Sequence, residues 1–368
     1  INSITSILSN GKFQEGLEKT TILLQRYPTE SLLFNLSGAC YQGLGQLNTA
    51  VEYYEKSIST DPSYFKAHFN LGGVLQELGK LNESIESFEN AISIKPDFAE
   101  AYNNIGNVFK EIRQSDNAIR SFKQAIEIKP DYVEAHFNLG QIFQELNEIK
   151  SAILSYENVL IFKPDFAQLH NNLGVIFQGI GEIDSSLKHF EEAIRIKPDF
   201  EEAHYNLGNA FYDYGQHNNA LESYRQALII NPENAQTHNN IGITLKALDK
   251  IDSALKSYKQ AILIKPNHFE AHYNLGNILK DLGQLDEAVK SYQKSLIFKQ
   301  DNAEAHNELG ITLMYLGKLD AAIKSYEEAI CINPVHEEFY NNLGIAFNMS
   351  GQFEEALKSL NQALSIKQ

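Results

Sequence analysis

Two kinds of chemically capable side chain recur along this 368-residue chain at intervals of 34 residues. Seven histidines share one register, and the imidazole is a common metal ligand and a general acid or base near neutral pH. They are His68, His136, His170, His204, His238, His272 and His306. Eight asparagines share the register two residues further on, and each amide can donate and accept hydrogen bonds at once. They are Asn70, Asn104, Asn138, Asn172, Asn206, Asn240, Asn274 and Asn342.

The histidine register does not suit a metal site. The ligands of one metal ion lie within about 2 Å of it, whereas equivalent positions on stacked helices stand about 8–10 Å apart. The register also holds Phe34, Tyr102 and Tyr340, which favours a packing role. Cys40 and Cys331 are far apart, and no phosphate loop or Ser/His/Asp order is present. We therefore predict no catalytic residue, no metal and no cofactor in this chain.

The spacing reflects an internal repeat that fills the chain. Glycine stands at every 34th residue from Gly38 to Gly344, and all nine prolines share another register, in which Gln300 fills the single gap. Ten repeats begin at residues 31, 65, 99, 133, 167, 201, 235, 269, 303 and 337, and the last ends two residues early. Residues 1–30 fit a truncated leading repeat, mainly its second helix.

The positions of one repeat are numbered from its first residue. Position 8 is glycine, position 20 is alanine or serine, position 24 is aromatic until Leu360, and position 32 is the shared proline. The small residues predict a close approach of two helices, with the aromatic ring filling the space beside them. One helix pair cannot bury both of its faces, so the repeats are expected to stack.

This pattern resembles the tetratricopeptide repeat (TPR) family, whose unit has the same length and the same small, aromatic and proline positions. Each repeat is predicted to form two helices separated by a glycine in the left-handed conformation, which Arg113, Asn147 and Asp249 replace in three repeats. Acidic pairs such as Asp97 and Glu100 are predicted to cap the following helices. The predicted fold is all-α. The resemblance implies an α-solenoid of antiparallel helix pairs, forming a right-handed superhelix whose concave groove is lined by first helices.

The asparagine register falls at position 6, which faces the groove in the TPR family. Asparagine is a mediocre residue inside a helix, so its recurrence needs a reason. The row resembles the asparagine ladder in the TPR region of the O-GlcNAc transferases, which implies that the amides hold an extended chain by its peptide groups. The alternative is that the amides bond locally between helices.

Other groove positions add candidate binding residues. Position 5 alternates between asparagine and an aromatic residue, which predicts apolar pockets for alternate ligand side chains or records an ancient two-repeat duplication. The aromatic members are Phe69, Phe137, Tyr205 and Tyr273. Position 9 contributes Asn107, Asn209 and Asn277. Acidic residues at position 13 favour a ligand with some positive charge, unless they only solvate this face.

Charge and hydropathy limit the partners. With 47 acidic and 31 basic residues, the net charge of −16 would repel nucleic acid. No apolar run approaches the roughly 18 residues of a membrane span, and no targeting leader is visible. We expect no nucleic acid or membrane partner and a cytoplasmic location. The last helix carries Leu357, Leu360 and Leu364 on one face, which a homodimer partner or a further domain is expected to cover.

The sequence therefore favours a non-catalytic scaffold that holds a protein or an extended peptide in its groove. The alternative is the substrate-recognition arm of a larger, glycosyltransferase-like enzyme whose catalytic domain lies outside this chain. RNA binding by helical repeats is disfavoured by the acidic balance.

Overall fold

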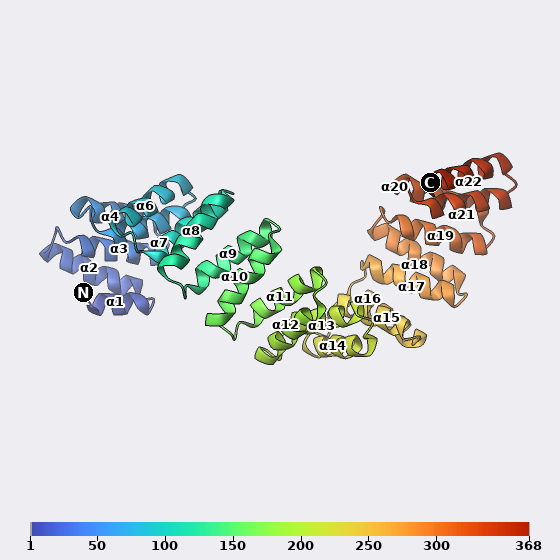
Figure 1. Ribbon diagram of the computed structural model, residues 1–368, viewed down its shortest axis with the longest axis horizontal. Helices are drawn as coiled ribbons and strands as arrows, with labels where there is room; N and C mark the ends of the chain where they lie inside the picture. Colours follow the sequence, from blue (N-terminus) through green and yellow to red (C-terminus); the bar gives the residue numbers. More distant parts are fainter. Residues whose placement is uncertain (1, 368) are drawn as a thin grey trace. The chain divides into compact units, whose positions relative to one another are not determined.

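The computed structural model describes residues 2–367, and every regular element in that range is an α-helix (Figure 1). The predicted all-α class is thus confirmed. The helices are α1 (Asn2–Ser9), α2 (Phe13–Arg26), α3 (Ser31–Gly43), α4 (Leu47–Thr60), α5 (Phe65–Glu77), α6 (Leu81–Ile94), α7 (Ala99–Glu111), α8 (Ser115–Ile128), α9 (Val133–Glu145), α10 (Ile149–Phe162), α11 (Ala167–Gly179), α12 (Ile183–Ile196), α13 (Glu201–Asp213), α14 (His217–Ile230), α15 (Ala235–Ala247), α16 (Ile251–Ile264), α17 (Phe269–Asp281), α18 (Leu285–Phe298), α19 (Ala303–Tyr315), α20 (Leu319–Ile332), α21 (Glu337–Met349) and α22 (Phe353–Lys367). None of these helices is long and apolar enough to cross a membrane.

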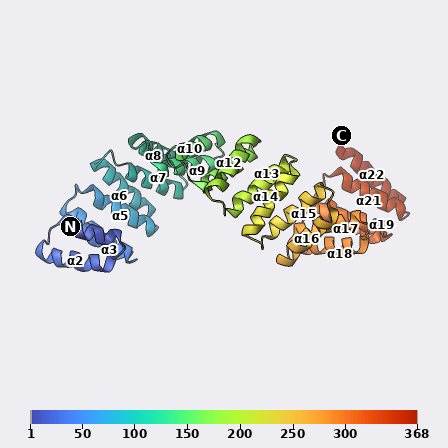
Figure 2. The same cartoon turned by 90° about the horizontal axis from the view of Figure 1, so that it is seen from below.

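The chain divides into two compact units, Ile1–Leu169 and His170–Gln368. Within each unit, a first helix packs on the second helix of its pair, and that second helix packs on the next pair. Figure 1 shows this order for α17 to α22, in orange and red, and Figure 2 shows it for α5 to α8. Successive first helices also touch, as α3 touches α5 and α15 touches α17. Each unit therefore presents a face built from first helices alone.

The core of each repeat is a ring packed directly against a glycine. A Cβ atom added to Gly72 in α5 would lie 2.8 Å from ring carbons of Phe88 in α6, which is fully buried. Position 20 sits beside them, since Ser84 donates its hydroxyl to the Gly72 carbonyl at 2.7 Å. The same contact recurs at each position-8 glycine, with Leu360 replacing the ring against Gly344. The predicted contact between positions 8, 20 and 24 is confirmed.

The turn between paired helices uses the left-handed backbone conformation that the sequence predicts. Gly215 has a φ angle of +74°, and the other glycines of this register lie between +70° and +82°. Arg113, Asn147 and Asp249 adopt φ angles of +60°, +59° and +57° in the same slot. Side chains other than glycine and asparagine adopt this conformation at a cost of about 1 kcal/mol each.

The predicted acidic helix caps are wrong. The N-cap of α7 is Phe98 rather than Asp97, and its side chain makes no capping hydrogen bond. The turn after the proline is one residue longer than the acidic pattern assumes, so position 34 becomes the N-cap. Where that position holds a suitable side chain, it does cap the helix: Asn302 accepts the backbone N–H of Ala305 at 3.1 Å.

Two adjacent glycines in α5 test the packing of ring on glycine. Gly72→Ala is expected to destabilise the protein by about 1–3 kcal/mol, because the new methyl group overpacks against Phe88. Gly73→Ala is the matched control, because its Cβ would meet nothing within 4 Å. It is expected to stabilise by about 0.5–1 kcal/mol, since alanine favours the helix. Urea unfolding followed by circular dichroism measures both shifts, and shifts of the same sign would contradict the packing argument.

Candidate functional site

The candidate binding residues lie on the first helices, and all fifteen of them are half-buried. Each side chain therefore has one edge against its neighbours and another edge in solvent. Asn70, Asn104 and Asn107, for example, lie on the adjacent first helices α5 and α7. The hydrogen bonds and packing contacts of the buried edge determine which groups the exposed edge can offer to a ligand.

Five of the eight position-6 amides bond to a buried asparagine of the preceding repeat. The Asn70 amide N–H donates to Oδ1 of Asn35 at 2.9 Å. The same bond joins Asn138 to Asn103 (3.0 Å), Asn206 to Asn171 (3.1 Å), Asn274 to Asn239 (3.0 Å) and Asn342 to Asn307 (3.0 Å). The acceptors all stand at position 5 and are 0–5% exposed. The alternation at position 5 thus has a structural cause, because each buried asparagine needs a partner from the next repeat.

The aromatic residues at position 5 occupy the remaining junctions and pack inward. The ring centroid of Phe69 lies 5.7 Å from that of Phe88 and 4.8 Å from that of Phe98. Equivalent contacts join Phe137 to Tyr156 and Phe166, Tyr205 to Tyr224, and Tyr273 to Tyr292, with centroids 5.8–6.0 Å apart. These rings therefore hold the repeat together as well as forming part of its surface.

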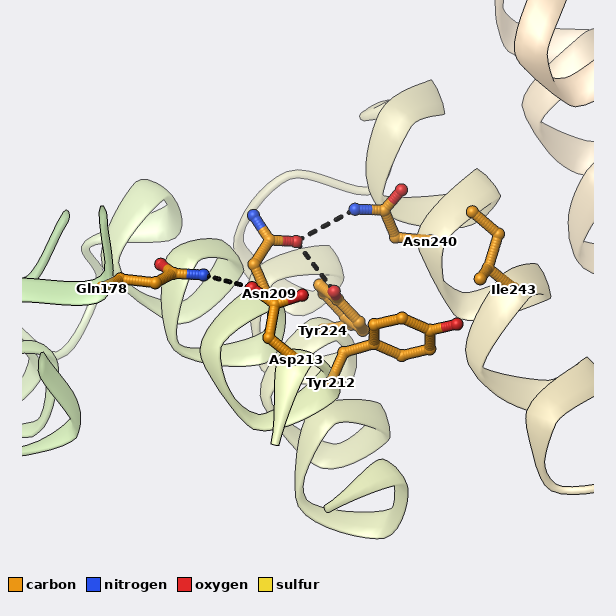
Figure 3. Close-up of a pocket in the computed structure, with 7 residues that line it drawn as sticks. All are labelled: Gln178, Asn209, Tyr212, Asp213, Tyr224, Asn240 and Ile243. Carbon is orange, nitrogen blue, oxygen red and sulfur yellow. Dashed lines mark hydrogen bonds between the residues drawn. The ribbon is translucent and has the colours of Figure 1, made fainter. Parts of the chain in front are cut away.

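One hollow opens at such an aromatic junction in each unit. In the N-terminal unit it is lined by Gln42, Phe69, Asn70, Gly73, Gln76, Glu77 and Asn104. In the C-terminal unit it is lined by Gln178, Asn209, Tyr212, Asp213, Tyr224, Asn240 and Ile243 (Figure 3). Both hollows draw on three successive first helices, and Asn104 and Asn240 occupy equivalent places in them.

Figure 3 shows how the C-terminal hollow is held in shape. Oδ1 of Asn209 accepts the amide N–H of Asn240 at 3.0 Å and the hydroxyl of Tyr224 at 2.8 Å. The amide of Asn240 also donates to the Tyr205 hydroxyl at 3.1 Å. Two repeats further along the chain, Asn277 likewise accepts the hydroxyl of the buried Tyr292 at 2.7 Å.

A second polar row runs beside the asparagines. The side chain at position 12 contacts the carboxylate at position 13 of the next repeat, as Gln42 donates to Glu77 at 2.5 Å. The same contact joins Gln76 to Glu111 (3.2 Å), Lys110 to Glu145 (3.2 Å), Gln178 to Asp213 (2.7 Å) and Lys246 to Asp281 (3.0 Å). Both rows pair residues that are 35 apart, one more than the repeat length. Comparing equal positions in the sequence missed these pairs, and a search at a spacing of 35 would have found them.

Histidines at position 4 bond to the turn that precedes their own repeat. Nε2 of His136 donates to the carbonyl of Pro130 at 2.9 Å. The same bond, at 3.0–3.1 Å, joins His68 to Pro62, His204 to Pro198, His238 to Pro232, His272 to Pro266 and His306 to Gln300. These imidazoles have a structural task. Among residues 2–367, no three potential metal ligands come together.

His170 has a second histidine as its neighbour. Nδ1 of His170 lies 3.0 Å from Nδ1 of His189 in α12, whose ring stacks on Phe177. Burial, with the charge of His170 as a smaller cause, lowers the pKa of His189 to about 4. Position 23, which His189 occupies, is serine in most repeats.

The last helix, α22, exposes two of the three leucines that the sequence places on one apolar face. Phe353, Leu357 and Leu364 are 67%, 62% and 60% exposed, whereas Leu360 packs on Gly344. The covering of this face by another chain or domain stays a prediction.

Stacked helix pairs with a polar face on the first helices of each unit define a helical repeat scaffold. Family models agree with that class. The model described as TPR repeat matches residues 40–79, 74–112, 114–147, 179–215, 208–249, 244–283 and 276–317, and models described as tetratricopeptide repeat match 133–166 and 301–368. The chain belongs to the tetratricopeptide repeat family. It is a helical repeat scaffold, and every family model that matches it describes this repeat.

Solved structures of TPR proteins resemble parts of this chain. The crystal structure of MamA is 26% identical and covers 44% of this chain and 94% of its own, with a TM-score of 0.42. MamA from Desulfovibrio magneticus RS-1 is 18% identical over 45% and 94% of the two chains, with a TM-score of 0.43. YrrB, described as a TPR protein with an unusual peptide-binding site, is 23% identical over 49% and 93%, with a TM-score of 0.41. The comparison with curated proteins finds no match. The resemblance of the asparagine row to that of the O-GlcNAc transferases stays a prediction.

The buried amide pairs predict a stability effect at position 6. Asn274→Ala is expected to destabilise by about 1–3 kcal/mol, because it leaves the side chain of Asn239, which is 1% exposed, without its donor. Removing both amides with Asn239→Leu and Asn274→Ala is expected to cost less than the sum of the single changes. A double-mutant cycle in urea measures this coupling. Asn341→Ala, at the exposed position 5 of the last repeat, should change stability by less than about 0.5 kcal/mol. Independent effects of Asn239 and Asn274 would contradict the pairing.

The histidine pair predicts a loss of stability in mild acid. The pKa of His189 is lower in the folded protein than in the unfolded chain, so the unfolded chain binds more protons between about pH 6.5 and pH 4. Stability is therefore lost as the pH falls through that window. His189→Ser, which restores the common residue, is expected to lessen this loss. The urea midpoints of both proteins at several pH values test it, and a pH-independent difference between them would contradict it.

Proposed function

We propose that this chain holds an extended protein segment or peptide along the face of its first helices. The observation that carries the proposal is the pair of open hollows, each lined by first helices of three successive repeats. Each hollow has a position-6 asparagine at its edge, Asn104 or Asn240, and a mixture of aromatic and amide walls. Recognition would be divided among the successive repeats of each unit, so the site is a row of repeats and not one repeat.

The internal amide bonds support this proposal rather than oppose it. An asparagine amide has two N–H donors and an oxygen, and Asn70 spends one N–H on Asn35. A donor and an acceptor remain, which are the two groups needed to pair with a peptide bond. The bond to Asn35 also fixes the amide before any ligand arrives, which reduces the entropy lost on binding.

The spacing of the rungs suits an extended chain. Neighbouring packed helices stand about 8–10 Å apart, and an extended chain rises about 3.3 Å per residue. One asparagine would therefore meet about every third residue of the ligand. Contacts to peptide groups do not depend on the ligand's side chains, so any sequence preference comes from the hollows between the rungs.

Binding by this face can be tested with peptides selected from a displayed library of random sequences about 16 residues long, which would span about five rungs. The combined variant Gly73→Phe, Asn104→Ala and Asn240→Ala fills one hollow and removes the amide at the edge of both. It is expected to weaken the selected peptides at least tenfold in fluorescence anisotropy. The Cβ of Gly73 has open space, so the fold should survive.

The matched control replaces Asn90 and Asn219 by alanine. Both are exposed asparagines on the second helices α6 and α14. This variant is expected to keep its affinity within about twofold. Circular dichroism melting verifies that both variants remain folded. If the hollow variant bound the selected peptides with unchanged affinity, the proposed site would be contradicted.

A further inference from the structure

We infer that the two hollows receive basic side chains of the ligand, arginine above all. The inference rests on the proposed function and names the chemistry of its ligand. It comes from comparing the hollows with the equivalent junctions two repeats further along the chain, where this protein supplies a cation of its own.

The chain's own lysines show what the position-13 carboxylate takes as a partner. In α7, Lys110 reaches Glu145 of the next repeat at 3.2 Å and the amide oxygen of Gln141 at the same distance. In α15, Lys246 reaches Asp281 at 3.0 Å. Lys110 is 26% exposed, so its stem is largely packed along this face while its ammonium group meets the carboxylate.

At the two hollows the same contact lacks its cation. Gln42 and Gln178 stand in the lysine slot and donate a neutral amide N–H to Glu77 and Asp213. None of the residues lining either hollow is a lysine or an arginine. Each hollow thus combines open space with a carboxylate that has only a neutral donor. A ligand cation placed there would make a charge-assisted hydrogen bond, which is about twice as strong as a neutral one.

The walls of the hollows favour the same kind of ligand. The half-buried Phe69 lines the N-terminal hollow, and the half-buried Tyr212 lines the C-terminal one (Figure 3). A cation over an aromatic face gains further attraction. Arginine suits this surrounding better than lysine, because its flat guanidinium can stack on a ring and still offer two N–H groups to a carboxylate.

The whole protein points in the same direction. Its net charge of −16 attracts basic segments from a distance and disfavours acidic ones. This long-range attraction alone would not place a cation in the hollows, so the test must separate local chemistry from net charge.

Three labelled probe peptides of about 18 residues, made of repeated Gly-Ser-Arg, Gly-Ser-Gln or Gly-Ser-Glu units, provide the ligands. The Arg peptide is expected to bind the unmodified protein at least tenfold more tightly than the other two. Two variants change the charge of the hollows. The first, Glu77→Gln with Asp213→Asn, removes the carboxylates. The second, Gln42→Lys with Gln178→Lys, supplies the internal cation that the hollows lack. Each is expected to weaken the Arg peptide by roughly three- to tenfold, the range of exposed charge pairs and charged hydrogen bonds.

The matched control is Glu145→Gln with Asp281→Asn. It also removes two negative charges, but from carboxylates that already have lysine partners. It is expected to change the affinity for the Arg peptide by less than about twofold. Equal losses in the control and the hollow variants would show that only net charge matters and would overturn the inference. Binding of the Gln or Glu peptide as tight as that of the Arg peptide, or no binding of the Arg peptide, would overturn it as well. The proposed face would then still be judged by the library-selected peptides, whose loss in the hollow variant does not depend on charge.

Discussion

The contact between the position-24 ring and the position-8 glycine sets the geometry of everything else in each unit. It fixes how closely the two helices of a repeat approach, because ring carbons of Tyr224 would lie 2.6 Å from a Cβ on Gly208. That distance in turn decides how the next pair seats and how near successive first helices come. The spacing of the proposed binding face depends on this contact, although neither residue needs to touch a ligand. A fixed spacing is what a row of identical hydrogen-bonding groups requires.

Successive first helices meet with an offset of one residue, and this offset creates both polar rows. It brings position 6 against position 5 of the preceding repeat, and position 13 against position 12. Burying an asparagine at position 5, such as Asn239, would cost stability if Asn274 did not supply its hydrogen-bond donor. Under the proposed function, the same amides would serve both stability and recognition. The result is a face whose polar groups are held in place before a partner arrives.

The sequence predicted what depends on one repeat and missed what depends on two or three. The glycine contact, the left-handed turn and the all-α class follow from residues within a single 34-residue unit. The cap at Phe98 was mispredicted because the length of the turn after proline is not written in the residue types. The partners of Asn70 and Glu77 were missed because they lie one residue out of register in the repeat before. The hollows need three helices at once, so no periodicity reveals them.

Position 5 alternates between asparagine and aromatic residues along the face. This alternation separates the needs of the fold from those of the proposed binding, which a uniform row would place on the same position-6 amides. At junctions with a buried asparagine, the position-6 amide must serve the fold, so under the proposed function a change there would alter stability and binding together. At aromatic junctions position 5 holds a ring that needs no amide partner. The Asn104 side chain forms no hydrogen bond to another described residue. Asn240 donates to the half-buried Asn209 and Tyr205, and its Oδ1 accepts the amide N–H of the buried Asn239 at 3.4 Å. Those junctions are where the hollows open. Gln42 lines one of these hollows, in the slot that Lys110 fills two repeats later, and both side chains contact the position-13 carboxylate of the next repeat. The proposed function therefore assigns ligand specificity to the junctions where the fold needs the amide least.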